Sequence, residues 1–302
     1  MRETGIAGTP REAGALDVLG SARRGRQRSP LARFVRNRAA GVGAAIILLI
    51  VLTALLAPVI APDDPYHQDL AASLQGPSAG HLFGTDSLGR DVLSRVLYGG
   101  RITIPMGVAA VAIALILGVP VGLFSGYRLG WTDTLAMRLT DILLAFPSLL
   151  LAMAIMAALG VHLWTVSVAI AVTSIPLYVR LVRGEVMRLR GREFVDAARC
   201  VGVNDRTIVF RHILPNALSP IIIQASLNAA LAILSVSALS FIGLGAQPPS
   251  AEWGAMLADG RSVMQVAWNV TTFPGIAIVL VVLGFNLLGD GLRDAYDPRS
   301  RR

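Results

Sequence analysis

The feature that most constrains this chain is a series of six apolar runs, each long enough to cross a lipid bilayer as a helix. The hydrocarbon core is about 30 Å thick and a helix rises about 1.5 Å per residue, so a span needs roughly 20 apolar residues. The runs cover residues 39–61, 102–126, 135–160, 161–182, 216–245 and 270–289. They predict an all-α integral membrane protein with six transmembrane helices.

The composition supports a membrane protein and excludes other classes. Charged residues make up 15% of the 302 residues and apolar residues make up 54%, whereas soluble domains carry about 25% charged residues. A disordered chain needs low hydrophobicity and high charge, and a soluble surface needs more charge than this chain has. The single cysteine, Cys200, excludes an internal disulfide framework and a metal site with several cysteine ligands.

All 27 basic residues are arginines, and their placement predicts how the helices are oriented in the membrane. Residues 1–38 hold nine arginines, the loop 183–215 holds seven, and the tail after residue 290 holds four. The segments 62–100 and 246–269 hold only three between them. Because basic flanks favour the cytoplasmic side, we expect both termini and the loop 183–215 to be cytoplasmic.

The spans divide the chain into segments with expected positions. We expect a cytoplasmic arm at residues 1–38, a first transmembrane helix at 39–61 and an extracytoplasmic segment at 62–101. The other five spans form a core at 102–290, which a cytoplasmic tail at 291–302 follows. The first apolar run is too long for the hydrophobic region of a typical signal peptide, so we expect an uncleaved helix.

The loop 183–215 is long for a membrane protein, and it has its own helical pattern. Apolar residues among the charges predict a first helix, which Gly202 interrupts. Asn204 or Asp205 can cap a second short helix, and Pro215 suits the first turn of the next span. The pattern predicts a helix–turn–helix unit on one membrane face.

Two interpretations fit this unit. Its arginines could hold an amphipathic hairpin on anionic lipids, and composition alone favours this interpretation. Alternatively, the unit could dock a soluble partner. In that case the small Ala197 and Ala198 would let the backbone sit deep in a cleft of the partner, and Glu193 and Asp196 would fix the orientation at its rim.

The spacing of the loop resembles the EAA loop of bacterial ABC-importer permeases. Asp196-Ala197-Ala198 is followed by three residues, Gly202, nine residues and His212-Ile213-Leu214-Pro215. The family pattern is an acidic residue, two alanines, three residues, glycine, nine residues, isoleucine, any residue, leucine and proline. Two positions depart from it: Asp196 replaces the usual glutamate, and His212 replaces isoleucine. We call residues 183–215 the EAA-like loop.

The resemblance implies that residues 193–204 form a coupling helix, which enters a groove on an ATP-hydrolysing subunit. The residues expected to contribute to this coupling are Glu193, Asp196, Ala197, Ala198, Gly202, Asn204, Asp205, His212, Leu214 and Pro215.

Three further segments resemble the permeases of dipeptide, oligopeptide and nickel importers. They are the run from His81 to Arg101, the run from Leu239 to Pro249 with Glu252-Trp253-Gly254, and the run from Phe285 to Asp294 with Asp297-Pro298-Arg299. The match covers residues 30–300. The long N-terminal arm resembles that of the second, or C, permease of such systems.

This resemblance implies the permease subunit of an ATP-driven importer for dipeptides, oligopeptides or a related solute, with nickel or glutathione as alternative cargo. The implied partners are a homologous second permease, two cytoplasmic ATPases, an extracytoplasmic solute-binding protein and membrane lipids, without nucleic acid. The implied mechanism is alternating access. A secondary transporter or channel is the alternative from another class, but it would need ion or proton sites near the midplane, where this chain has almost no charge.

No catalytic, cofactor-binding or metal-binding residues are expected in this chain. It lacks the GxxxxGK[ST] arrangement of a phosphate-binding loop, so ATP and Mg²⁺ should be bound by the partner ATPases. His67 and His81 are fourteen residues apart, and this spacing indicates no metal site. In the third run, Arg138 and Asp141 are spaced to form an ion pair on one helical turn.

The glycine-rich stretch 84–91 allows two interpretations of about equal weight. It could be a capped turn that opens a short helix over 91–98, or it could be part of an extracytoplasmic gate or a contact for the binding protein. The residues concerned are Gly84, Thr85, Asp86, Gly89, Arg90 and Asp91.

Overall fold

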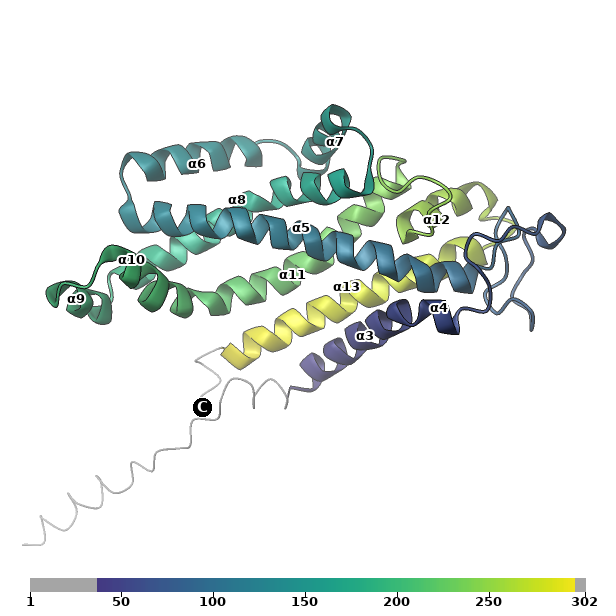
Figure 1. Cartoon of the computed structure of the whole chain (residues 1–302), viewed down its shortest axis with the longest axis horizontal. Coiled ribbons are helices and arrows are strands. Elements are labelled where there is room, and N and C mark those ends of the chain that lie inside the picture. Colours follow the sequence, from purple (N-terminus) through teal and green to yellow (C-terminus); the bar gives the residue numbers. More distant parts are fainter. Residues whose placement is uncertain (1–36, 297–302) are drawn as a thin grey trace, which may run out of the picture.

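The computed structural model describes residues 37–296, so the arm 1–36 and the tail 297–302 lie outside the described residues. Within the described part the chain is almost entirely helical, and its one β-type pairing is an isolated bridge between Thr85 and Asp91. The expected all-α class is therefore confirmed. The long helices lie roughly side by side along the longest axis of the molecule (Figure 1).

The helices keep the labels of Figure 1. The longer helices are α3 Arg38–Leu55, α5 Val92–Arg128, α6 Trp131–Leu144, α7 Ser148–Leu159, α8 Leu163–Arg190, α11 Leu214–Phe241 and α13 Asn269–Tyr296. The short helices and turns are α4 Ala57–Ile60, η1 Leu70–Ala72, α9 Glu193–Cys200, α10 Asp205–Thr207, the π-helical turn η2 Ile208–Ile213, α12 Trp253–Gly260 and η3 Arg261–Val263.

In the described part, five helices are long and apolar enough to cross a membrane, and the pair α6 and α7 is a sixth candidate. The chain bends by 92° between these two helices. Pro147 explains the break, because proline has no N–H to donate and disfavours helical geometry in the residue before it. α6 ends at Leu144 and α7 begins at Ser148, directly after Pro147. The predicted third span, 135–160, is therefore broken.

The second span begins earlier than its apolar run indicated. We expected a start at residue 102, whereas α5 begins at Val92 and continues for 37 residues. Asp91 caps the helix by accepting a hydrogen bond from the backbone N–H of Ser94 at 2.7 Å. The fourth span likewise continues beyond its predicted end. Charged residues end an apolar run, but they do not end a helix that leaves the membrane.

Glycines bring α5 and α8 into close backbone contact. Gly118, Gly122 and Gly126 recur at every fourth residue of α5 and face α8. A Cβ atom on Gly122 would lie 2.8 Å from the backbone oxygen of Val179 and 2.8 Å from the Cβ of Val182. Small residues at this spacing let membrane helices approach closely and pack by van der Waals contact. α5 and α8 form the most extensively packed helix pair within residues 37–296.

The start of the first described helix and the end of the last one lie side by side. The Asn37 side-chain amide donates a hydrogen bond to Oδ2 of Asp294 at 2.8 Å. The far end of α3 packs beside the start of α5, where a Cβ on Gly100 would lie 2.9 Å from the Cβ of Ala54. α3 therefore begins, and α13 ends, toward the end of the bundle where α5 ends and α9 lies (Figure 1).

Asp141 pairs with a different arginine from the one expected. Its Oδ1 accepts a hydrogen bond from Nη2 of Arg180 on α8 at 2.6 Å, so the prediction of a pair with Arg138 was wrong. Asp133 forms a second link to α8, accepting two hydrogen bonds from Arg183 at 2.6 and 2.7 Å. Both pairs tie α6 to α8 across the bundle.

The glycine contact predicts a difference in stability between two alanine variants. Gly122→Ala places a methyl group against the α8 backbone, and overpacking of this kind costs about 1–3 kcal/mol. Gly184→Ala is the matched control, because no atom lies within 4 Å of the position its Cβ would take on α8. Thermal unfolding of the purified protein in detergent should show a lower midpoint for Gly122→Ala only. Equal midpoints for the two variants would contradict the contact.

Candidate functional site

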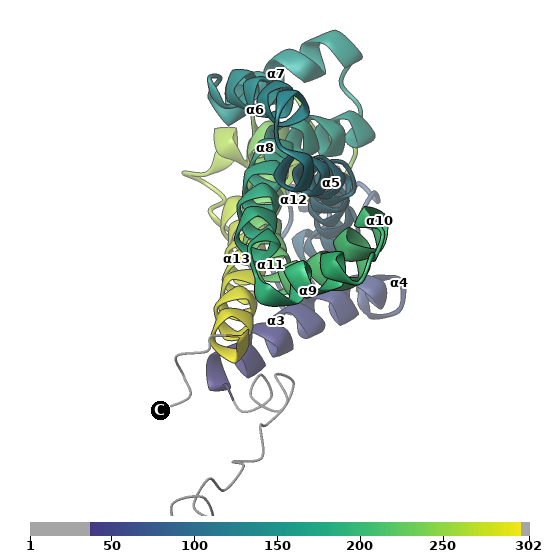
Figure 2. The same ribbon diagram turned by 90° about the vertical axis from the view of Figure 1, so that its left-hand side faces the viewer.

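The EAA-like loop forms a unit at the end of the bundle where α5 ends. α9 follows α8 after Gly191 and Arg192, and α10, η2 and α11 continue from it (Figure 2). The first turn of α9 carries Glu193 and Asp196, and its last turn carries Arg199. This arrangement suits the helix dipole, which favours acidic residues at the start and basic residues at the end. The side chains of Asp196 and Arg199 also pair at 3.2 Å.

Gly202 has a backbone conformation that the loop requires. Its φ of +79° lies in the left-handed region, which glycine adopts without the penalty of a β-carbon. The N–H of Gly202 donates to the carbonyl of Arg199 at 2.9 Å, and the N–H of Val203 donates to the carbonyl of Ala198 at 3.0 Å. These two bonds form a Schellman motif, which ends a helix and satisfies its last carbonyls. The glycine of the EAA-like spacing therefore ends α9.

α9 has one face toward the bundle and one face outward. Val195 is fully buried and Ala198 is 8% exposed, and both pack into an apolar cluster shared with α5, α8, η2 and α11. Phe194, Ala197 and Val201 are exposed, and we call these three residues the outward face of α9. The expectation that both alanines enter a partner needs correction, because Ala197 is exposed while Ala198 packs inward.

The second half of the loop is continuous with the next span. Asn204 caps it, because its Oδ1 accepts a hydrogen bond from the backbone N–H of Arg206 at 3.0 Å. The helix then runs from Asp205 to Phe241, so the expected second short helix does not end before the span. Pro215 has no N–H to donate. The π-helical turn η2 ends two residues before it, within the same continuous helix.

The remaining predicted loop residues differ in exposure. Glu193, Asp205 and Pro215 are exposed, whereas His212 and Leu214 are partly buried. Leu214 packs against the apolar cluster beneath α9. The backbone carbonyl of His212 accepts a hydrogen bond from the side chain of Asn216 at 2.6 Å.

Tyr127, at the end of α5, holds the two halves of the loop together, and it is not among the residues predicted for the site. Its hydroxyl donates a hydrogen bond to Oδ1 of Asp205 at 2.5 Å. The guanidinium carbons of Arg190 and Arg199 each lie 5.7 Å from the centre of the tyrosine ring, within the range of cation–π attraction. One side chain of α5 therefore contacts residues of α8, α9 and α10. No local pattern marks it, because all three partners are distant in the sequence.

The contacts beneath α9 connect it mechanically to three spans. The buried side chains of this cluster come from α5, α8, α9, η2 and α11: Leu123, Tyr127, Val182, Val186, Leu189, Val195, Ala198, Ile208, Val209, Ile213, Ala217 and Ile221. Protein interiors are close-packed and transmit strain. A displacement of α9 would therefore move the ends of α5, α8 and α11 with it.

The glycine-rich stretch 84–91 lies at the opposite end of α5, and its polar side chains are buried. Thr85, Asp86, Arg90 and Asp91 are each at most 3% exposed. Nε of Arg90 donates to Oδ2 of Asp86 at 2.6 Å, and the backbone N–H of Arg90 donates to Oδ1 at 3.0 Å. The stretch is therefore a buried turn whose last residue caps α5. Its role as a gate or a contact for a binding protein stays a prediction.

Glycine conformation shapes this turn too, since Gly84 and Gly89 have φ of +72° and +73°. A Cβ on Gly89 would collide with the backbone of Asp69.

A buried polar network extends from this turn to the segment before α12. Arg95 is 1% exposed and donates to the carbonyl oxygens of Pro65 at 3.1 Å and Ser250 at 3.2 Å. Glu252 is fully buried and accepts a hydrogen bond from the Thr103 hydroxyl at 2.9 Å. Burial raises the pKa of the Glu252 carboxyl above its ordinary value. These contacts hold two distant segments, one at Pro65 and one at residues 250–252, against the start of α5.

Two family models match the chain. One, described as "Binding-protein-dependent transport system inner membrane component", matches residues 118–302. The other, described as "N-terminal TM domain of oligopeptide transport permease C", matches residues 28–77.

Named relatives are similar over most of the chain. The dipeptide transport system permease protein DppC of Alkalihalophilus pseudofirmus is 49% identical over 266 residues, which cover 88% of this chain and 88% of the relative. The glutathione transport system permease protein GsiD of Pectobacterium atrosepticum is 46% identical over 270 residues, which cover 89% and 90%. A chain of the MetNI methionine ABC transporter, solved in an inward-facing conformation, has a similar fold. Its TM-score is 0.55 at 17% identity, with 67% of this chain and 97% of that chain covered.

The geometry of Gly202 predicts how the loop responds to substitution. Gly202→Ala places a β-carbon in the left-handed region, which costs about 1–2 kcal/mol, and Gly202→Asn should cost less because asparagine tolerates this region better. No atom lies within 4 Å of the added Cβ, so the effect comes from the backbone alone. Hydrogen exchange of the purified protein should show faster exchange in α9 for the alanine variant than for the asparagine variant. Equal exchange in wild type and both variants would contradict this role.

Proposed function

We propose that this chain, which belongs to the family of binding-protein-dependent transport system inner membrane components, carries short peptides across a bacterial inner membrane. The chain is a permease subunit of an ABC importer and is of the C type within the peptide and nickel group. Two similar relatives are named for dipeptide and glutathione transport, and glutathione is itself a tripeptide. Nickel or another small solute is the alternative cargo.

The observation that carries the proposed mechanism is the outward face of α9. Two large apolar side chains, Phe194 and Val201, are 41% and 78% exposed on either side of Ala197. Exposed apolar residues grouped in this way are typical of an interaction surface. The opposite face of α9 is fixed in the bundle, so a partner bound to the outward face would act directly on the spans.

Charge favours a protein over a lipid surface as the partner of α9. Both signs of charge are exposed beside the outward face, with Glu193 and Asp196 next to Arg192 and Arg199. The negative surface potential of anionic lipids attracts the arginines but repels the carboxylates. A soluble ATPase subunit can supply complementary basic groups and an apolar groove. We therefore propose that α9 is the coupling helix and that the partner ATPases bind the ATP and Mg²⁺.

The placement of the arginines supports the proposed orientation. Three parts of the chain lie toward the same end of the bundle (Figure 1): the start of α3, the EAA-like loop and the end of α13. Arginine-rich flanks of membrane helices favour the cytoplasm, so we place this end there. The segment from α4 to α5 then lies on the extracytoplasmic side of the membrane, where a solute-binding protein would deliver cargo.

A cavity between α7, α8 and α11 is the proposed contribution of this chain to the pathway. Its volume is about 250 Å³, and polar side chains interrupt its apolar lining: Ser148, Thr173, Ser174, Asn228 and Ser235. Polar groups within a membrane bundle are costly unless they are hydrogen-bonded or face water. Neutral hydroxyl and amide groups suit the amide groups of a peptide. A homologous second permease would provide the opposite wall.

The docking proposal predicts the effect of a charge on the outward face of α9. Ala197→Arg should lower the amount of ATPase subunit that copurifies with the permease by roughly tenfold or more, because an unpaired charge would be buried at the interface. Ala79→Arg is the matched control, since Ala79 is an exposed alanine in the segment before α5. The control should retain its ATPase subunits. Normal copurification of Ala197→Arg would contradict docking on this face.

The pathway proposal predicts which positions water and cargo reach. Cys200 is the only cysteine of the chain, so Cys200→Ser provides a background without thiols. In that background, Ser174→Cys in the cavity should react with a membrane-impermeant thiol reagent, and transported peptide should slow the reaction. Val279→Cys is the control, because it lies outside the cavity on apolar α13. Reaction of the control alone, or no protection of Ser174→Cys by peptide, would contradict the pathway.

A further inference from the structure

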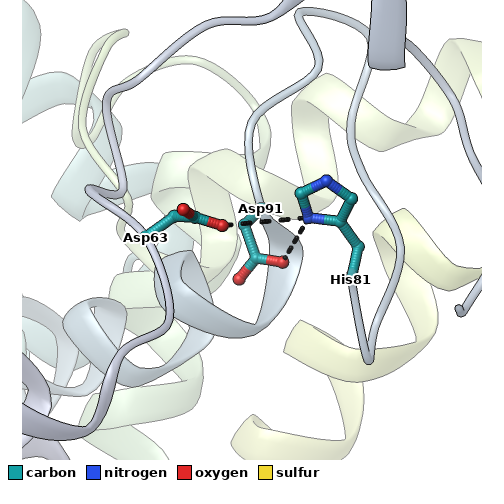
Figure 3. A group of neighbouring side chains, drawn as sticks. All are labelled: Asp63, His81 and Asp91. Atoms are coloured by element: carbon teal, nitrogen blue, oxygen red, sulfur yellow. Dashed lines mark hydrogen bonds and ion pairs between the residues drawn. The ribbon is translucent and has the colours of Figure 1, made fainter. Parts of the chain in front are cut away.

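Three side chains that can bind metal ions converge where the segment after α4 meets the start of α5. Asp63 follows α4, His81 lies on the loop before the glycine-rich turn, and Asp91 caps α5 (Figure 3). Nδ1 of His81 is 3.1 Å from Oδ1 of Asp91 and 3.9 Å from Oδ2 of Asp63. One ligand atom from each residue lies within 4.8 Å of the other two. The histidine spacing alone did not predict this cluster, because its carboxylates come from other parts of the segment.

Within the part of the chain that the structure describes, no arginine forms an ion pair with Asp63 or Asp91. The nearby Arg90 and Arg95 pair instead with Asp86, at 2.6 and 3.6 Å. Within residues 37–296, His81 is the sole ion-pair partner of Asp63 and Asp91.

Burial makes this imbalance more significant at Asp91. Its side chain is 1% exposed, and a buried carboxylate is costly unless it is paired or coordinates a metal. His81 can carry at most one positive charge, so it cannot balance both carboxylates of the cluster. A cation bound between the three side chains would compensate that charge.

Supporting hydrogen bonds from Ser94 hold Asp91 and the backbone of Asp63 in place. Oδ2 of Asp91 accepts hydrogen bonds from both the backbone N–H and the hydroxyl of Ser94 at 2.7 Å, which leaves Oδ1 turned toward His81. The Ser94 hydroxyl oxygen in turn accepts a hydrogen bond from the backbone N–H of Asp63 at 3.1 Å. Metal-binding carboxylates are typically held by outer hydrogen bonds of this kind. One serine therefore orients the Asp91 carboxylate and holds the backbone at Asp63 beside it.

We propose that Asp63, His81 and Asp91 bind a divalent transition-metal ion, with Zn²⁺ as the best fit. A nitrogen and two carboxylate oxygens suit Zn²⁺, which accepts three protein ligands and a water molecule in a tetrahedral site. Ligands about 2.0–2.2 Å from the ion would lie about 3.3–3.6 Å apart. The pair of His81 and Asp91 is already near that separation, and the half-exposed Asp63 needs only a small movement. The metal ion would replace the contact between Nδ1 and Oδ1 of Asp91, and a proton carried by Nδ1 would be released to solvent.

The bound ion would fasten the segment between α4 and α5 at three points. It would join the end of α4, the loop at His81 and the first turn of α5, and thereby fix the surface that this segment forms at its end of the bundle. The imidazole ligand should favour Zn²⁺ over Ca²⁺ and Mg²⁺, which prefer oxygen ligands. This inference is independent of the proposed transport function.

Metal binding to the purified permease complex tests this site. The complex, free of affinity tags and stripped with a chelator, is titrated with Zn²⁺ in competition with a chromogenic chelator. Asp63→Asn and His81→Ala should each weaken binding to this chain by roughly tenfold or more, because each removes one of three ligands. His67→Ala is the matched control, since His67 is an exposed histidine of the same segment outside the cluster. The control should bind Zn²⁺ as the wild type does.

A second readout reports the ligands themselves. Co²⁺ in place of Zn²⁺ should give the strong visible absorption of a tetrahedral site in the wild type and in His67→Ala, and lose it in Asp63→Asn. Asp63 is exposed, so this variant should keep its fold, and an unchanged far-ultraviolet circular dichroism spectrum checks that. Wild-type Zn²⁺ affinity in both Asp63→Asn and His81→Ala, tighter binding of Ca²⁺ than of Zn²⁺, or no Zn²⁺ binding by the wild type would overturn the proposal.

Discussion

The close backbone contact between α5 and α8 is the interaction on which the rest of the structure depends. Inside a bilayer no hydrophobic force drives helices together, so close packing of small residues holds them instead. The glycines of α5 provide that packing against α8. α8 forms one wall of the cavity and is followed by α9 after two residues, while Tyr127 in the last turn of α5 holds the loop. The position of the cavity and the position of α9 therefore follow from the same contact.

This arrangement gives a physical route between a partner at one end and the spans. α9 contributes Val195 and Ala198 to the apolar cluster, and its outward face remains exposed. Two ion pairs join α6 to α8, so the bent pair of α6 and α7 is also connected to the helix that leads to α9. The opposite end is held differently, by a buried network of charged and polar side chains around Arg95 and Asp86. The two ends of α5 are thus anchored differently, by apolar packing and the contacts of Tyr127 at one end and by buried ion pairs at the other.

The sequence was sufficient for features that depend on local composition and spacing. The apolar runs predicted the helical membrane class, and the glycine of the EAA-like spacing marks the end of α9. Other features depend on tertiary contacts that no local pattern encodes. Arg180 rather than Arg138 pairs with Asp141, because α8 packs beside α6. The cluster of Asp63, His81 and Asp91 forms only when a long segment folds back on itself. Pro147 itself indicated a break, but the apolar run around it is long enough for one uninterrupted span, and that length decided the prediction.

The central claim is that the outward face of α9 docks an ATPase subunit, and Cys200 allows a direct measurement. It is exposed on α9 and is the only cysteine of the chain, so a maleimide reagent modifies this chain at one known position. The rate of modification is measured in the permease complex with its ATPase subunits bound and after their removal. The account predicts modification slower by roughly tenfold or more when the ATPase is bound. Equal rates with and without the ATPase would contradict docking through α9.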